Sequence, residues 1–302
     1  MTAPFASHRN AGLFMALGAY AVWGVMPLYL RLVHWVPPYE FIAWRVLFTL
    51  PVCLAFVVLF RQFPALKAGL TNPKLLRLLA LSALLVGINW TIYIAAVQSG
   101  HVLASSLGYY INPLANVFAG TLFLGERLSQ RQWLAVALAA LGVSLLAWDA
   151  REMLWISLSL AVTFCGYGLV RKLAPVESLP GLTIETLILL VPAALVAWHF
   201  AGLPAGSAMD HGLGNAALVS VSGLMTGIPL LLFAAAARRM DYSALGMTQF
   251  ISPTIVFVLG VTVFGEALKP SQLACFGFIW AAIAVFVWDI AARRGSPAQA
   301  PA

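Results

Sequence analysis

The stretch INPLANVFAGTLFLGERLSQRQWLAVALAALGVSLLAWD at residues 111–149 recurs as ISPTIVFVLGVTVFGEALKPSQLACFGFIWAAIAVFVWD at residues 251–289. The two copies align without a gap at one constant offset, which pairs Ile111 with Ile251 and Asp149 with Asp289, and nine of their 39 positions are identical. Several identities are Pro, Glu, Gln, Trp and Asp, which two apolar segments rarely share by chance. The pattern predicts an internal duplication within sequence that is apolar enough for a membrane.

The composition excludes a water-soluble domain. Of the 302 residues, 62% are hydrophobic and 9% are charged, whereas a soluble domain carries about 25% charged residues. The chain is therefore expected to expose its surface to lipid. The formal net charge is +7, but the basic residues are scattered as pairs between apolar runs, which argues against a nucleic-acid partner. Cys53, Cys165 and Cys275 form no CxxC pair and are expected to be buried thiols.

Ten apolar segments approach the length of about 20 residues that a membrane-crossing helix needs. Backbone groups in lipid must be paired within the segment, so helices are expected, and the sequence lacks the short alternating segments of a β-barrel. The predicted fold class is an all-α integral membrane protein with ten transmembrane helices as two inverted five-helix repeats. The expected spans are residues 11–32, 40–60, 75–97, 102–125, 131–148, 153–170, 182–201, 214–237, 243–264 and 271–291.

The distribution of Lys and Arg predicts how these spans are oriented. With a cytoplasmic N-terminus, 13 of the 17 basic residues fall in cytoplasmic loops and tails, three fall on the opposite side, and Arg45 lies within a span. This asymmetry follows the positive-inside rule. Both termini are therefore expected in the cytoplasm.

An odd number of spans in each half makes the second half enter the membrane in the opposite direction. The Gly125-Glu126 step then lies on the cytoplasmic side, and its copy Gly265-Glu266 lies on the other side. Two similar halves that exchange conformations can open a central site to either side in turn. The expected limits are 11–148 for the first repeat, 153–291 for the second, and 1–10 and 292–302 for the cytoplasmic tails.

Several stretches resemble a known family. Two five-helix halves, each with a Pro-containing fourth helix that runs into Gly-Glu-x-Leu, are similar to the EamA repeat of the drug/metabolite transporter superfamily, and more narrowly to its RarD branch. The resemblance covers nearly the whole chain. It implies a permease of the plasma (inner) membrane, with the first four helices of each half lining a central cavity and the fifth at the periphery. The matching stretches are AVWG at 21–24, PLY at 27–29, VPP at 36–38, GYYINPL at 108–114, LPGLTIET at 179–186 and QFISPT at 249–254.

The fourth span carries polar residues on one face. Ser105, Tyr109, Asn112 and Asn116 follow helical spacings of four, three and four. A polar stripe that faces lipid is costly, so this face is expected to look into the bundle. Pro113 removes a backbone hydrogen bond and can kink the helix. The stripe then lines a hydrated cavity or, alternatively, forms a hydrogen-bonded seam between helices.

Other candidate residues for solute binding occupy the first, second, third and ninth spans. Aromatic walls with a few polar groups suit a mostly apolar organic molecule. The alternative is that each aromatic residue packs in the bundle or anchors it at the membrane interfaces. The candidates for solute binding are Asn89, Tyr93, Tyr109, Asn112, Gln249, Ser252, Arg45 and Trp23, and the candidate hinges are Pro113 and Pro253.

Three charged residues in or near spans have more than one interpretation. Arg45 can hold an anionic group such as a carboxylate, or it can extend to the interface or pair with an acid. Glu40 and Glu185 align only after a five-residue insertion in the second half, and both are expected to open their helices, where the dipole stabilises a negative charge. A gating role is the alternative for these two acids.

The predicted function is secondary transport of a small organic metabolite or drug-like solute, by efflux or exchange, through alternating access. The sequence has no Walker A, HExxH or GxSxG motif, so no ATP use, catalytic residue, metal or cofactor is expected. No acid stands out deep in a span, which leaves the coupling ion open. A non-transporting assembly factor and an integral-membrane enzyme are the alternatives. The expected partners are the solute and the lipid bilayer, and a homodimer is left open.

Overall fold

The computed structural model describes residues 3–99, 101–149, 151–265 and 269–295. The regular structure in these ranges is helical, and they contain no strand. The helices are α1 (Ala3–Leu32), α2 (Pro38–Leu59), α3 (Phe63–Leu70), α4 (Pro73–Gln98), α5 (Val102–Phe123), α6 (Gln130–Asp149), η1 (Arg151–Met153), α7 (Leu154–Leu173), α8 (Ser178–Ala201), η2 (Ala208–Asp210), α9 (Leu213–Ser220), α10 (Ser222–Ala237), α11 (Tyr242–Gln249), α12 (Ile251–Thr262) and α13 (Pro270–Gly295).

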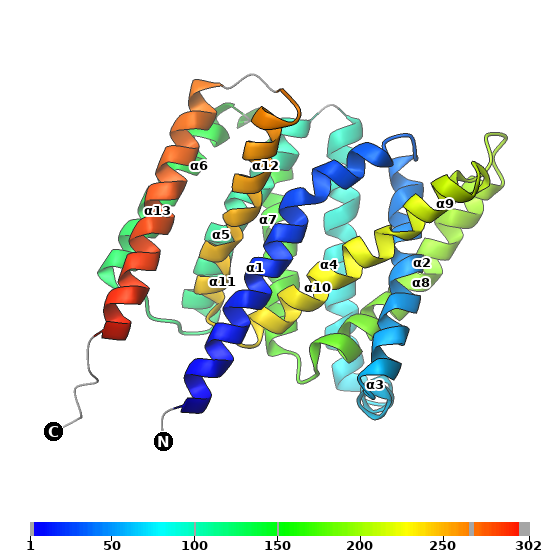
Figure 1. Cartoon of the computed structure of the whole chain (residues 1–302), viewed down its shortest axis with the longest axis horizontal. Coiled ribbons are helices and arrows are strands. Elements are labelled where there is room, and N and C mark those ends of the chain that lie inside the picture. Colours follow the sequence, from blue (N-terminus) through cyan, green and yellow to red (C-terminus); the bar gives the residue numbers. More distant parts are fainter. Residues whose placement is uncertain (1–2, 100, 150, 266–268, 296–302) are drawn as a thin grey trace.

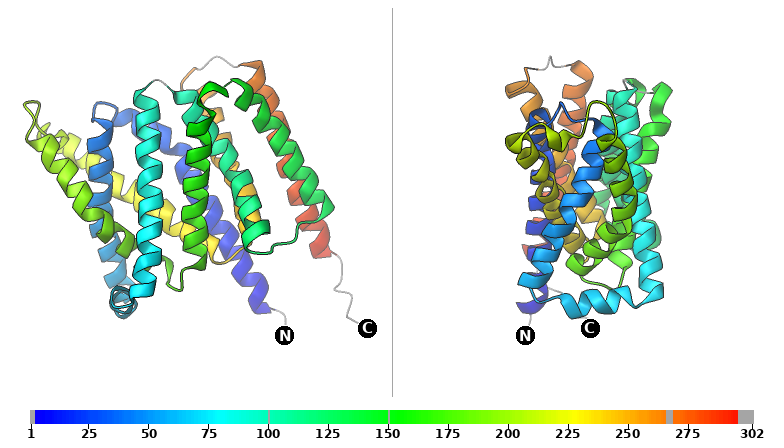
Figure 2. Two further views of the ribbon diagram at one scale, coloured as in Figure 1. Left: turned by 180° about the vertical axis from the view of Figure 1, so that it is seen from behind. Right: turned by 90° about the vertical axis from the view of Figure 1, so that its right-hand side faces the viewer.

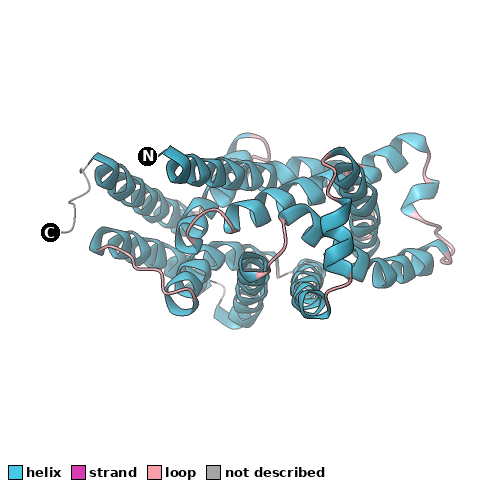
Figure 3. Ribbon diagram, turned by 90° about the horizontal axis from the view of Figure 1, so that it is seen from below, coloured by secondary structure: helices cyan, strands magenta, loops and turns pink. Residues whose placement is uncertain are grey.

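The long helices lie side by side in one bundle, with α6 and α13 paired at one edge and α2 and α8 at the other (Figure 1). They form two layers, with α1, α10, α12 and α13 in one layer and α4, α5, α6 and α7 in the other (Figures 2 and 3). The first turn of α1 and the last turn of α13 lie at the same end of the bundle, here called the termini end. The opposite end is called the far end. The short helix α3 lies across the termini end.

Nine helical segments in the described ranges are long and apolar enough to cross a membrane. They confirm the prediction of an all-helical, multi-pass membrane protein. The long helix outside this set is α5, which has 22 residues. Its Ser105, Tyr109, Asn112 and Asn116 make it less apolar than its neighbours, although it packs against α6, α7 and α11 inside the bundle.

Helices of the two halves begin at the same offset as the sequence copies. The helix pairs whose first residues are separated by this repeat offset are α2 with α8, α4 with α9, α5 with α11, and α6 with α13. The contacts between helices follow the same correspondence. Helix α1 packs on α10 and α12, and in the same way α7 packs on α4 and α5. Helix α2 packs on α10, and in the same way α8 packs on α4. In addition, α2 packs on α8, α5 on α11 and α6 on α13. A two-fold relation between the halves would generate this set of contacts.

Glu185 lies elsewhere in its helix than the sequence alignment predicts. Helix α8 begins at Ser178, so Glu185 is two turns into the helix and not at its start. Because the starts of α2 and α8, Pro38 and Ser178, already match at the repeat offset, no insertion is needed, and Arg45 is the counterpart of Glu185. The predicted five-residue insertion and the helix-start role of Glu185 are therefore wrong. Glu40 does lie in the first turn of α2.

Two further features differ from the ten simple spans. Helix α3 occupies the loop between the second and third expected spans, and its Leu66 and Gly69 are buried, with Gly69 close to Ile184 of α8. The ninth expected span divides at Phe250 into α11 and α12, whereas α5 continues through Pro113 as one helix. The two helices that carry the candidate hinge prolines therefore differ in shape.

Helices α2 and α10 approach closely at Gly223, the first glycine of a GxxxG motif that ends at Gly227. The Thr49 hydroxyl donates a hydrogen bond of 3.3 Å to the carbonyl oxygen of Gly223. A Cβ atom on Gly223 would collide with the backbone of Phe48, whereas a Cβ atom on Gly227 would lie 3.4 Å from the Thr49 methyl group. Gly223 therefore sets the spacing between these two helices.

We expect Gly223→Ala to destabilise the protein by about 2 kcal/mol or more, because the backbone of α2 must move away from the new methyl group. Thermal unfolding of the purified protein in mild detergent measures the effect. Gly227→Ala is the matched control, one turn along the same helix, and should cost less than about 1 kcal/mol. Equal stability of the two variants would contradict the close approach at Gly223.

Candidate functional site

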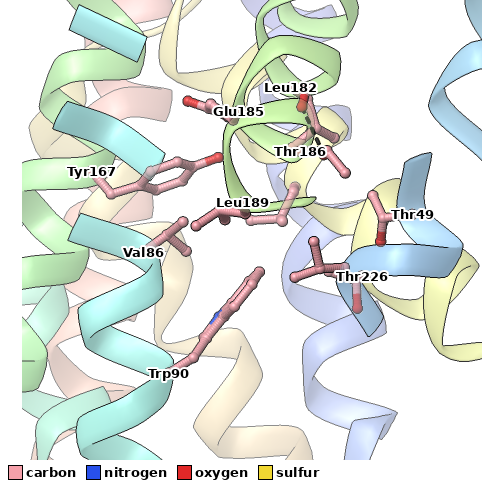
Figure 4. Close-up of a pocket in the computed structure, with 11 residues that line it drawn as sticks. Thr49, Val86, Trp90, Tyr167, Leu182, Glu185, Thr186, Leu189 and Thr226 are labelled. Atoms are coloured by element: carbon pink, nitrogen blue, oxygen red, sulfur yellow. Dashed lines mark hydrogen bonds between the residues drawn. The ribbon is translucent and has the colours of Figure 1, made fainter. Parts of the chain in front are cut away.

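A pocket lies inside the bundle, between α2, α4, α7, α8 and α10 (Figure 4). Its cavity volume is about 20 Å³, room for about one water molecule and well below the range of about 300–1,000 Å³ for small-molecule sites, so a solute would fit only after the helices move apart. In Figure 4, Tyr167, Val86 and Trp90 lie along one side, and Thr49 and Thr226 lie across from them. The lining residues are Val46, Thr49, Val86, Trp90, Tyr167, Leu182, Glu185, Thr186, Leu189, Thr226 and Leu230.

The two halves of the chain line this pocket with corresponding positions. A two-fold axis that related the two halves would pass through a pocket lined in this way. Glu185 also lines it, and the counterpart of Glu185, Arg45, contacts two lining residues, Thr226 and Trp90. The lining residues that correspond at the repeat offset are Val46 with Thr186, Thr49 with Leu189, Val86 with Thr226, and Trp90 with Leu230.

Arg45 reaches the far end of the pocket from α2. Its Nε donates a hydrogen bond of 2.9 Å to Oγ1 of Thr226. Its guanidinium carbon lies 4.9 Å from the ring centroid of Trp90 and 5.9 Å from that of Phe41. Among the described residues, no carboxylate pairs with it. Cation–π contacts contribute about 0.5–2 kcal/mol each and occupy the face of the guanidinium group. Arg45 therefore keeps its charge and its remaining N–H donors for binding an anion.

Three tyrosines surround this guanidinium group. Tyr29, Tyr93 and Tyr109 are all within electrostatic reach of Arg45. The rings of Tyr93 and Tyr109 meet edge to face, with centroids 5.7 Å apart. Tyr109 keeps 41% of its surface exposed. The surroundings of Arg45, beside the lining residues Trp90 and Thr226, are therefore aromatic and positively charged.

The opposite end of the pocket is sealed by buried polar residues. Tyr167 and Arg171 are 0% exposed, and Glu185 is 2% exposed. The Nε atom of Arg171 lies 3.6 Å from Oε1 of Glu185, and the Ser82 hydroxyl donates to the same oxygen. The pocket thus has Arg45 beside its far end and a buried ion pair toward the termini end.

Asn89 lies in a seam between helices and does not line the pocket. Its Nδ2 donates to the carbonyl oxygen of Leu160 and to Oγ1 of Thr163, both at 2.9 Å, so it joins α4 to α7. The next residue, Trp90, faces the pocket instead, because successive residues of a helix point about 100° apart.

The polar stripe of α5 also bonds to other helices. Asn112 donates from Nδ2 to the carbonyl oxygen of Ala161 on α7 at 3.1 Å. Asn116 donates to Oδ1 of Asn112 at 3.2 Å and to Oε1 of Gln249 on α11 at 2.9 Å. This geometry matches the seam that was the alternative interpretation of the stripe. Solute binding by Asn89, Asn112 and Gln249 stays a prediction, and none of the three lines the pocket.

Trp23 belongs to an aromatic cluster beside the pocket. Its ring centroid lies 5.6–5.8 Å from those of Tyr20, Phe164 and Phe233. Phe233 stacks on Tyr167, which lines the pocket. Trp23 therefore supports the pocket wall from behind.

The structure places the remaining candidates in helices next to the pocket. Ser252 and Pro253 lie in the first turn of α12, directly after the division at Phe250, and Pro113 lies inside α5. Of the predicted set, the structure brings together Arg45, Tyr93 and Tyr109. The hinge roles of the two prolines and solute binding by Ser252 stay predictions.

Glu126 has a structural role that its sequence position did not reveal. Its Oε1 accepts a hydrogen bond of 2.6 Å from the Tyr242 amide, and its Oε2 accepts 2.8 and 2.6 Å bonds from the amide and hydroxyl of Ser243. The carboxylate therefore caps the start of α11 and ties it to the end of α5. In the sequence, the repeated Gly-Glu step pointed to Glu126, but it does not show which helix the carboxylate contacts. The copy, Glu266, lies outside the described residues.

Comparison with known proteins identifies the family. The model of the EamA-like transporter family matches residues 10–148. The RarD protein of Salmonella typhimurium is 43% identical over 284 residues, which cover 94% of this chain and 97% of the relative. A protein of Pseudomonas aeruginosa named as an uncharacterized transporter is 44% identical over 286 residues, which cover 94% of this chain and 95% of the relative.

One solved crystal structure has the same fold. It superposes with a TM-score of 0.70 and covers 91% of this chain and 96% of its own chain at 21% sequence identity. The likeness at that identity shows the fold alone, whereas the identity to the curated relatives extends over almost their whole length. The chain belongs to the EamA-like transporter family, in its RarD branch.

Proposed function

We propose that the protein is a secondary transporter that carries a small organic solute across the plasma membrane by alternating access, for efflux or exchange. In this proposal ten helices cross the membrane, namely the nine apolar spans and α5. The repeats at 11–148 and 153–291 enter the membrane in opposite directions, and both termini are cytoplasmic. Membership of a transporter family and a pocket between the two halves support transport over catalysis or assembly.

Two features support the inverted arrangement. Gly125 and Gly265 follow corresponding helices and have nearly equal positive φ angles of 65° and 66°, a conformation that glycine adopts at low cost. Helix α5 ends at the termini end of the bundle, and α12 ends at the far end (Figure 1). An inverted duplication produces equal local structure at opposite ends in this way.

Single cysteines at Arg127 and Lys269 test the arrangement. Both residues are exposed and follow corresponding helices. We expect an impermeant thiol reagent to label Arg127→Cys from the cytoplasmic side and Lys269→Cys from the outside. The unsubstituted protein is the control, since Cys53, Cys165 and Cys275 are buried. Labelling of both variants from one side would rule out inverted repeats.

The observation that carries the proposed site is Arg45, which contacts the lining of a pocket between the halves and has no carboxylate partner among the described residues. A carboxylate can accept two parallel hydrogen bonds from a guanidinium group. Trp90, Tyr93 and Tyr109 offer aromatic surface for the body of such a molecule. We therefore assign the substrate class as a small organic anion with an apolar or aromatic body, bound with its charge at Arg45.

Arg45→Gln tests this site. We expect solute flux to fall at least about tenfold, because charge-assisted hydrogen bonds contribute about 1.5–3 kcal/mol. The solute is identified by comparing the metabolites that cells release with and without the protein. Its flux is then measured in proteoliposomes that contain the protein. The matched control is Arg31→Gln, since Arg31 is an exposed arginine that lies over the ring of Phe264. Undiminished flux through folded Arg45→Gln protein would refute the anion site.

Asn112→Leu separates solute binding from helix packing. Asn112 bonds to Ala161 and Asn116 and does not line the pocket. We expect a loss of about 0.5–2 kcal/mol of stability, typical of hydrogen bonds between membrane helices, with an unchanged KM for the solute. Unfolding in detergent and flux in proteoliposomes measure the two quantities. A tenfold rise in KM at unchanged stability would instead make Asn112 a ligand.

A further inference from the structure

A cluster of polar side chains is buried where the pocket meets the termini end. It consists of Ser82 on α4, Tyr167 and Arg171 on α7, and Glu185 on α8. All four are 2% exposed or less. Because Glu185 lies two turns inside α8, its carboxylate is the deep acidic group that the sequence did not reveal.

The polar atoms of this cluster are only partly paired. The Oε1 atom of Glu185 faces Nε of Arg171 and accepts from Ser82. The Oε2 atom of Glu185, the Nε and Nη1 atoms of Arg171 and the Tyr167 hydroxyl are buried without a hydrogen-bond partner. Native proteins seldom leave several neighbouring buried groups unpaired, so such a group is a candidate for exchange with water or an ion. Glu185 and Tyr167 also line the pocket, whose volume of about 20 Å³ is enough for a water molecule.

Arg171 holds the end of α7 against the start of α8. Its Nη2 donates a hydrogen bond of 2.9 Å to the carbonyl oxygen of Ser178, at the first turn of α8. Its guanidinium group also packs directly on Gly181, where any side chain would collide with it. The Arg171–Glu185 pair therefore closes the space between α7 and α8 on the side of the pocket that faces the termini end.

We infer that the Arg171–Glu185 pair is the gate at the termini end of the pocket and that Glu185 opens it by binding a proton. The inference rests on the proposed transport function and adds its coupling ion. A proton from water adds to Oε2, and the neutral carboxyl no longer attracts the guanidinium group. Arg171 then turns toward the water at the termini end, and the proton leaves Oε2 once water reaches it from that side.

The side chains that face the pair from the helices packed around it carry no charge at neutral pH. The nearest titratable groups are Tyr167 from α7 and Cys53 from α2, which are neutral at neutral pH, while α4 contributes Ser82 and α10 contributes Thr226. Helix α3 meets α8 at Gly69, which carries no charge.

Arg238, which lies outside the spans, adds repulsion. Partial burial, and then the charges of Arg171 and Arg239, lower the pKa of Arg238, while Glu177 acts in the opposite direction. Without the negative charge of Glu185, Arg171 is therefore left near a second cation. This repulsion would weaken the closed position of Arg171.

Another buried carboxylate, that of Glu40, provides a matched comparison. One oxygen of Glu40 accepts hydrogen bonds from Trp44, Ser207 and the Ala208 amide at 2.8–3.0 Å. Neither oxygen of Glu40 is both buried and unpaired. Glu40 is a buried acid with satisfied contacts and without a basic partner, so it should not act as a gate.

Thiol labelling of the pocket tests the gate without any solute. The probe is Leu182→Cys, which lies in the pocket lining one turn before Glu185, in a background with Cys53, Cys165 and Cys275 replaced by alanine. An impermeant maleimide is added to membrane vesicles whose cytoplasmic face is outside. The exposed Arg127→Cys variant in the same vesicles confirms the orientation and corrects for the pH dependence of the reagent.

We expect the corrected labelling rate of Leu182→Cys to rise about fivefold or more from about pH 8 to about pH 6. With Glu185→Gln added, the rate should be high at both pH values, and with Glu40→Gln added it should follow the parent. Gly181→Ala, which displaces Arg171 and leaves the carboxyl in place, should also label rapidly at both pH values.

The inference is overturned if labelling of the parent does not respond to pH, or if Glu185→Gln keeps the response of the parent. If Glu185→Gln does not fold, an unaltered response in Gly181→Ala overturns it equally. These outcomes are separate from the flux of Arg45→Gln, so the gate can fail while the proposed transport function stands.

Discussion

Hydrocarbon offers no hydrogen-bond partner, and this constraint organises the whole bundle. The backbone satisfies it by forming helices, and the polar side chains satisfy it by turning toward other helices. Asn89 bonds to α7, Asn112 to α7 and Asn116 to α11, so three amides link neighbouring helices of the bundle. Where facing helices separate slightly, the same inward preference leaves polar groups around a pocket. The hydrogen-bonded seam and the pocket therefore both follow from the lack of hydrogen-bond partners in lipid.

The sequence predicts the elements of this fold better than their partners. Long apolar runs mark the helices because lipid requires them, and the constant repeat offset marks the related halves. The inward direction of the α5 stripe follows from the same reasoning. Whether Asn112 faces a cavity or a neighbouring backbone depends on the distance to α7, which close contacts such as that of Gly108 with Leu160 determine. No local pattern contains that distance, so the site could be predicted only in part.

Glu185 shows how residue type can mislead an alignment. Pairing it with Glu40 matches two acids but requires an insertion, whereas the helix starts require none and pair it with Arg45. A duplicated scaffold repeats backbone positions, because they determine packing, but its two halves can carry opposite charges. That difference gives one pocket a cation beside its far end and an acid at its sealed end. A symmetric frame with unequal ends is suited to a solute that itself has one charged end.

Glu40 and Glu185 also show that burial alone does not make a functional carboxylate. They lie in the corresponding helices α2 and α8, and both are nearly inaccessible. Glu40 meets three donors, two of them in the segment that leads into η2, so its charge is stabilised by local structure and moving it would break several bonds at once. Glu185 shares one oxygen between an arginine and a serine, and leaves the other oxygen free of partners. A low-dielectric site magnifies this difference, because one proton there changes the charge balance of two helices.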